Sequence, residues 1–158
     1  KLIFRFDEPV LPDGVGALYS AACPPMWWSP SFGRESEGQV ITAFATGDYA
    51  RDLAALGEIG ALEAALQVLR DELNRPEIEP VAARWINWTA DPFSLGGYSV
   101  ATPGAHQARL ALGQPTPPLF WAGEATAKNA WAATVHGALV SGQRAAAEVQ
   151  QSMLHPIL

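Results

Sequence analysis

Residues that could do chemistry lie near the C-terminal end of this 158-residue sequence. Glu124 follows the apolar run 119–123, and a helical pattern begins after Thr134. The first N–H groups of a helix lack partners inside it and carry a partial positive charge, so they favour an anion or an electron-rich ring. The small residues Gly137 and Ala138 would let a flat ligand approach the backbone. The same spacing also fits an ordinary alanine-rich helix that follows a strand.

The elements that would position these residues are a buried strand, a turn and the helix. Residues 120–122, Phe-Trp-Ala, suit a covered strand, and Gly123 lets the backbone turn where a side chain would obstruct it. Along the helix, apolar and small residues recur at alternating spacings of four and three. They predict one apolar stripe: Val135, Leu139, Gly142, Ala146, Val149 and Met153.

The remaining sequence predicts an α/β order of elements. Apolar and partly β-branched runs predict strands over residues 1–6, 17–22, 39–46 and 81–88. Capping residues and apolar periodicity predict helices over 48–56, 59–73 and 106–112. Residues 23–32, in which prolines interrupt an aromatic-rich run, predict a loop.

Composition limits the functional classes open to this chain. Hydrophobic residues make up 49% and charged residues 16%, which is enough apolar content for a core. The net charge of −6 argues against binding nucleic acid through a basic face. No apolar run approaches the roughly 18 residues that span a membrane, and a cytoplasmic location is the default expectation. One cysteine and three scattered histidines predict no metal site.

Two segments carry a pattern more specific than their secondary structure. Residues 119–126 read Leu-Phe-Trp-Ala-Gly-Glu-Ala-Thr, and residues 136–146 read His-Gly-Ala-Leu-Val-Ser-Gly-Gln-Arg-Ala-Ala. They closely resemble the C-terminal flavin-contacting segment of the flavin-containing amine oxidases, a family of monoamine and polyamine oxidases and lysine-specific histone demethylases. Residues 88–99 resemble its crossover between two domains, and residues 1–9 resemble the strand that carries its lysine.

The resemblance implies a fragment of a two-domain flavoprotein of the α/β class. Residues 1–95 would be part of an α+β substrate-binding lobe. Residues 96–158 would supply the last strand and long helix of an FAD-binding Rossmann-like domain. No Gly-x-Gly-x-x-Gly occurs, so the dinucleotide-binding turn is absent from these residues. We therefore expect a C-terminal fragment, either a proteolytic or truncated product or one chain of a split protein.

The resemblance also implies a role for particular residues. Lys1 would hold a water against the reactive nitrogen of the flavin, as the catalytic residue, although a solvent-exposed lysine at a strand end is the alternative. The expected cofactor-binding residues are Gly123, Glu124, Thr134, Val135, Gly137 and Ala138. For Glu124, the alternative is a partner of the helix end.

Aromatic residues are the expected substrate contacts. Residues 129–132, Asn-Ala-Trp-Ala, occupy the place of an aromatic wall beside the flavin, which Trp131 would form, and Trp27 and Trp28 could line the substrate entrance. For all three, packing is the alternative.

The implied activity is the FAD-dependent oxidation of a small-molecule amine to an imine, with O2 reduced to hydrogen peroxide. One alternative is a catalytically silent fragment or assembly module, which would need the missing N-terminal FAD-binding portion, a partner chain or another copy of itself. The other is a related flavin oxidase or desaturase, although those relatives usually carry Asp in place of Glu124 and lack Lys1.

Overall fold

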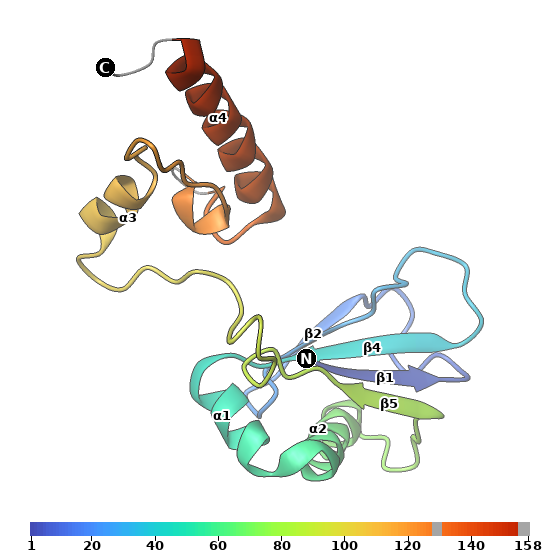
Figure 1. Ribbon diagram of the computed structural model, residues 1–158. Coiled ribbons are helices and arrows are strands. Elements are labelled where there is room, and N and C mark those ends of the chain that lie inside the picture. The colour runs from blue at the N-terminus through green and yellow to red at the C-terminus, as the bar shows by residue number, and fades with distance from the viewer. Residues whose placement is uncertain (128–130, 155–158) are drawn as a thin grey trace. The chain divides into compact units, whose positions relative to one another are not determined.

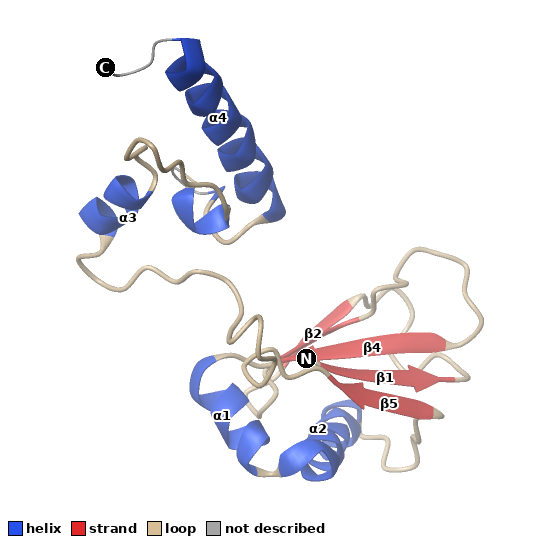
Figure 2. Cartoon of the chain, viewed as in Figure 1, coloured by secondary structure: helices blue, strands red, loops and turns tan. Residues whose placement is uncertain are grey.

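The computed structural model describes residues 1–127 and 131–154, and the chain forms two compact units, Lys1–Trp88 and Thr89–Leu158. The five strands found among the described residues belong to the first unit, which we call unit 1, and the second, unit 2, contains short helical segments and one long helix (Figures 1 and 2). The boundary between the two units lies after residue 88, earlier than the expected boundary at residue 95. The assignment of the two units to a substrate lobe and a cofactor lobe stays a prediction.

Unit 1 is built on an antiparallel sheet with the strand order β2-β3-β4-β1-β5. The strands are β1 (Leu2–Phe6), β2 (Ala17–Tyr19), β3 (Met26–Trp28), β4 (Gln39–Phe44) and β5 (Ala82–Trp85). Side chains alternate between the two faces of a strand, and β1 accordingly buries Leu2, Phe4 and Phe6. The predicted strands at 1–6, 17–22, 39–46 and 81–88 are confirmed in shortened form.

Two helices cover the face of the sheet that carries these buried residues (Figure 2). They are α1 (Gly47–Ala55) and α2 (Gly57–Leu73). The small residues Ala61 and Ala65, together with Leu69, are fully buried and let α2 lie close to the strands. Asn74 ends α2 in the left-handed conformation, with φ of 50°, so the helix ends after residue 73 as the sequence predicted. Unit 1 therefore has a core of its own.

Unit 2 contains α3 (His106–Leu112), a 3-10 turn η1 (Glu124–Thr126) and α4 (Val135–Leu154). The sequence predicted α3 with these bounds, and it predicted the long helix. The buried positions of α4 are Gly137, Ser141 and Ala145, so this small-residue face packs within unit 2. Most of the expected apolar stripe is exposed instead: Val135 is 84%, Leu139 63% and Met153 78% exposed.

Two expectations about local structure were wrong. Residues 23–32 do not form only a loop, because Met26–Trp28 pair with both β2 and β4. Residues 120–122 do not form a strand: in the described part of unit 2, the only β pairing is an isolated bridge between Thr116 and Leu119. A strand needs a hydrogen-bonded neighbour, and no other strand of unit 2 is described beside this segment.

No helix among the described residues is long and apolar enough to cross a membrane. No group of three or more His, Cys, Asp or Glu side chains that could hold a metal ion occurs in the same described ranges.

Candidate functional site

The carboxylate of Glu124 joins two segments of unit 2. Its Oε1 accepts the backbone N–H of Ser99 at 2.8 Å, and its Oε2 accepts the Ser99 hydroxyl at 2.7 Å and the Ala133 N–H at 2.6 Å. Arg109 donates to the Ser99 hydroxyl oxygen at 3.2 Å. Partial burial opposes ionisation, but these hydrogen bonds and the charge of Arg109 hold the pKa of Glu124 below its ordinary value. Glu124 is therefore an ionised carboxylate that orders the backbone on either side of it.

Gly123 is held from one side and open on the other. Its N–H donates to Ser141 Oγ at 3.0 Å, and its carbonyl accepts from the Thr126 N–H at 3.0 Å and the Thr126 hydroxyl at 2.9 Å. Its φ is 122°, a conformation that favours glycine, and a Cβ built there would meet nothing within 4 Å. The backbone of Gly123 is thus fixed by buried Ser141, while its open side leaves room for another group to approach.

The start of α4 is closed by a side-chain cap. Thr134 Oγ1 accepts the N–H of Gly137 at 3.0 Å and donates to the Trp131 carbonyl at 2.6 Å. A Cβ at Gly137 would lie 2.0 Å from that carbonyl oxygen, so the glycine is required by packing inside unit 2 rather than by a ligand. Val135 and Ala138 are exposed on the same turn. Within the described residues, no acceptor is found for the N–H of Val135.

Trp131 lies beside this helix start. The residue is 50% exposed, and its ring contacts His136 edge to face, with ring centroids 5.5 Å apart and an interplanar angle of 83°. The expectation that this loop forms an aromatic wall also rested on Asn129 and Ala130, which lie outside the described residues. Trp131 is therefore a half-exposed aromatic face next to the N-terminus of α4.

Arg144 connects α4 to the segment that precedes it, a role that sequence reasoning missed. Its guanidinium donates to the carbonyls of Trp121 and Thr126, and its Nε lies 3.3 Å from Glu148 Oε1. The sequence contained a signal for this role, because an arginine among small residues on a helix needs hydrogen-bond acceptors when its side chain is partly buried. Arg144 positions the backbone on which Glu124 sits.

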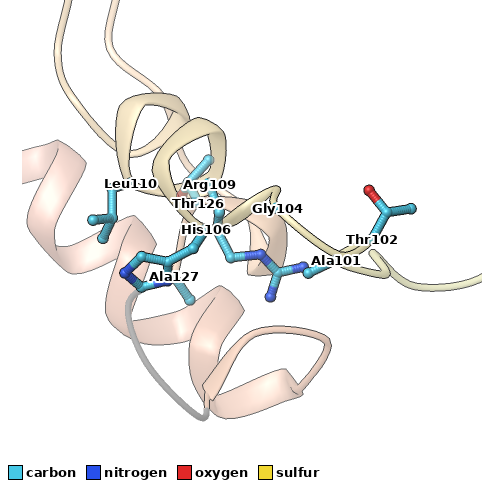
Figure 3. A pocket seen from close by; sticks show the side chains of 8 residues that line it. All are labelled: Ala101, Thr102, Gly104, His106, Arg109, Leu110, Thr126 and Ala127. Atoms are coloured by element: carbon cyan, nitrogen blue, oxygen red, sulfur yellow. The ribbon is translucent and has the colours of Figure 1, made fainter.

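A pocket of about 330 Å³ opens in unit 2 between α3 and the C-terminal end of η1 (Figure 3). His106, Arg109 and Leu110 line it from α3, and Thr126 and Ala127 from the other side. Arg109 links it to the contact between Ser99 and Glu124. No motif predicted this pocket, because it forms where segments distant in sequence meet.

In unit 1, Lys1 and Trp28 lie together and Trp27 is separate from them. Lys1 Nζ is 5.9 Å from the Trp28 ring centroid and 5.8 Å from that of Phe44. Trp27 is fully buried, stacks on Phe4 with centroids 6.2 Å apart, and donates from Nε1 to the Pro24 carbonyl at 2.8 Å. Trp27 thus takes the packing alternative and is removed from the substrate-entrance residues, because its side chain reaches no open surface of unit 1.

Comparison with known proteins decides the family. The sequence model described as flavin containing amine oxidoreductase matches residues 1–150. The chain belongs to the flavin-containing amine oxidoreductase family. Among curated relatives of this family, lysine-specific histone demethylase 1 homolog 1 of Arabidopsis thaliana is 34% identical over 125 residues. That alignment covers 75% of this chain and 15% of the relative.

Two proteins with other names are similar as well. Nicotine dehydrogenase of Pseudomonas putida is 32% identical over 128 residues, covering 76% of this chain and 26% of the relative. A solved structure of putrescine oxidase bound to putrescine superposes with a TM-score of 0.82 at 21% identity. The superposition covers 95% of this chain and 34% of the putrescine oxidase chain, so the fold is that of part of a larger flavoprotein.

Proposed function

We propose that this chain is the C-terminal part of an FAD-dependent amine oxidase, which oxidises an amine to an imine while O2 is reduced to hydrogen peroxide. The family match over residues 1–150 carries the proposal. The similar proteins include putrescine oxidase and nicotine dehydrogenase, and their names support a small-molecule amine as the substrate class. FAD, when bound, would accept two electrons from the amine and pass them to O2.

The residues of unit 2 fit a flat, anionic group. Gly123 has an open side, and the exposed start of α4 offers an N–H at Val135 beside Ala138. We assign these positions, with Glu124, Thr134 and Gly137 behind them, to FAD. The helix N-terminus would stabilise negative charge on the bound group. Thr134 and Gly137 act by closing the helix start, and Glu124 by fixing the backbone before it.

We propose that three side chains that are not fully buried face the substrate or the flavin. Lys1 would hold a water and move a proton during reoxidation. Trp131 would exclude water from the amine and favour its neutral form, since burial disfavours an ammonium. Trp28 stays in the proposal as an aromatic residue near Lys1, while Trp27 serves the core.

We also propose that residues 1–158 alone are inactive and need the N-terminal FAD-binding portion or a partner chain that supplies it. They contain no Gly-x-Gly-x-x-Gly to hold the pyrophosphate. The exposed apolar residues of α4, such as Leu139 and Met153, support a partner that covers this helix. Amine turnover by residues 1–158 supplied with FAD would contradict this part of the proposal.

The test of the activity is an anaerobic titration of the purified full-length protein, followed by visible absorbance. Putrescine, nicotine and an aromatic primary amine are added separately, and O2 is then admitted while peroxide is measured. Bleaching of a flavin band by one of these amines and formation of peroxide on reoxidation support the proposal. A protein without a flavin band, or one whose band no amine bleaches, contradicts it, and bleaching without peroxide contradicts only the O2 step.

The role of Lys1 is tested with a matched pair of variants. Lys1→Met should slow reoxidation by O2 by about 100-fold or more, since proton transfer by a positioned group contributes about that much. Arg5→Met removes a cation from the same strand, where Arg5 pairs with Asp7 at 3.6 Å, and should leave the rate unchanged. Equal rates in the two variants would exclude Lys1 from the reaction.

A further inference from the structure

Three side chains meet on the face of the unit 1 sheet that α1 and α2 leave uncovered. The ladder pairs Leu2 with Ala43, and both are buried on the face that the helices cover. Lys1 comes directly before Leu2, so its side chain lies on the opposite face of the sheet. Met26 pairs with Phe44 in the same ladder. Phe44 on β4 and Trp28 on β3 share this second face, because the residues next to them, Ala43 and Trp27, are fully buried on the first. Neighbouring strands therefore bring one ammonium and two aromatic rings together.

The two rings form a corner around the ammonium. Trp28 and Phe44 meet edge to face, with centroids 6.2 Å apart and planes at 75°. Lys1 Nζ lies 5.9 Å from the first centroid and 5.8 Å from the second. A cation within about 6 Å of an aromatic centroid is attracted by the ring's negative face, most strongly to tryptophan. Both rings thus contribute to the position of one nitrogen.

Other groups do not account for this position. Among the ion pairs of the described residues none involves Lys1, so no carboxylate there fixes the ammonium. The main chain of Lys1 is anchored separately, since its nitrogen donates to the Ile86 carbonyl at 2.9 Å. A long, four-carbon side chain on an anchored backbone still needs a contact at its end to hold one conformation.

We propose that Trp28 and Phe44 are positioning residues, which hold the ammonium of Lys1 at one place on the open face of the sheet. The effect of this positioning on reoxidation rests on the proposed function, in which Lys1 moves a proton during that step. It gives Trp28 a contact with the lysine and adds Phe44, which no motif had singled out. The aromatic corner acts through Lys1 and forms no bond with the substrate.

The positioning itself is tested without any cofactor. The chain contains only two lysines, Lys1 and Lys128, so the Lys128→Arg chain gives a single lysine side-chain signal in a carbon–proton NMR spectrum. Ring currents should displace the ε-methylene protons of Lys1 from the position of a free lysine. Trp28→Leu and Phe44→Leu should each move this signal toward the free position, whereas Trp28→Phe and Phe44→Tyr should largely retain it. An unmoved signal in both leucine variants would overturn the proposal.

A control on the same strand removes the effects of general repacking. Met26 lies on β3, on the same face as Trp28, and is the cross-strand partner of Phe44 on that face. Met26→Leu changes packing there without removing a ring, and it should leave the Lys1 signal in place. A shift as large as that of the leucine variants above would show that repacking, and not the rings, determines the position.

The consequence for the reaction is measured on the flavin-bearing full-length protein. Trp28→Leu and Phe44→Leu should slow reoxidation by about 2- to 5-fold, the range expected when one exposed cation–π contact is lost, and Trp28→Phe should restore it. Leucine variants that release the Lys1 signal but reoxidise normally would overturn the consequence. If Lys1→Met is itself without effect, the proposed role of Lys1 fails, while the NMR result still decides the positioning.

Discussion

Ser99 and Glu124 are joined twice, by a backbone N–H at 2.8 Å and a hydroxyl at 2.7 Å, across 25 residues of sequence. The third donor to the same carboxylate, the N–H of Ala133, comes from the chain just before α4. One side chain thus connects its own turn after Gly123 to two other segments, the one that holds Ser99 and the approach to the long helix. Two of the four segments that resemble the family, residues 88–99 and 119–126, meet at this carboxylate.

Glu124→Gln should loosen this junction without removing the side chain. A hydrogen bond to a charged group contributes about 1.5–3 kcal/mol, so the amides of Ser99 and Ala133 should exchange with solvent about 10- to 100-fold faster. Amide hydrogen exchange measures this directly. In a double-mutant cycle with Ser99→Ala, the two changes should be non-additive, and additive effects would show that the contact is not energetically coupled.

Acid should weaken unit 2 through the same residue. The pKa of Glu124 lies below its ordinary value of 4.5, so between the two values the unfolded chain binds more protons than the folded one. The stabilisation is complete above the ordinary value and is lost as the pH falls through the folded pKa. Denaturation across this acidic range should show a decline that is shallower in Glu124→Gln. Parallel curves for the two proteins would contradict the prediction.

Two glycines on α4 should respond in opposite directions to the same substitution. Gly137→Ala places a Cβ 2.0 Å from the Trp131 carbonyl oxygen and should destabilise unit 2. Gly142→Ala meets nothing within 4 Å and should stabilise the isolated chain by about 0.5–1 kcal/mol, because alanine favours a helix. Thermal denaturation followed by circular dichroism compares them. A stable Gly137→Ala variant would show that the helix start is not packed in this way.

The adjacent tryptophans of β3 should differ in their effect on stability. Trp27 is fully buried and Trp28 only partly, so Trp27→Ala should lower the free energy of unfolding of unit 1 by about 3–5 kcal/mol. Trp28→Ala should lower it by less, since it leaves no internal cavity. Urea denaturation of both variants measures the difference, and equal losses would contradict the core position of Trp27.

Local patterns predicted much of the fold. The helix over 106–112, the end of α2 after residue 73 and the strand at 1–6 depend on caps and periodicity within a few residues, and the structure has all three. The position of Glu124 beside a helix start was also visible, since it depends on a short, specific motif. The donors that engage it were not, because Ser99 reaches it only through the folding of the intervening loop.

By itself, the sequence determined the family, the order of elements and the residue types at the candidate site. Tertiary structure alone decided which faces are buried: α4 packs through Gly137 and Ser141 although its apolar residues lie on another face. It also decided that Met26–Trp28 pair as a strand and that residues 120–122 do not. The physical reason is that caps and helix periodicity act between near neighbours in sequence, whereas strand pairing and burial depend on partners that only the folded chain brings together.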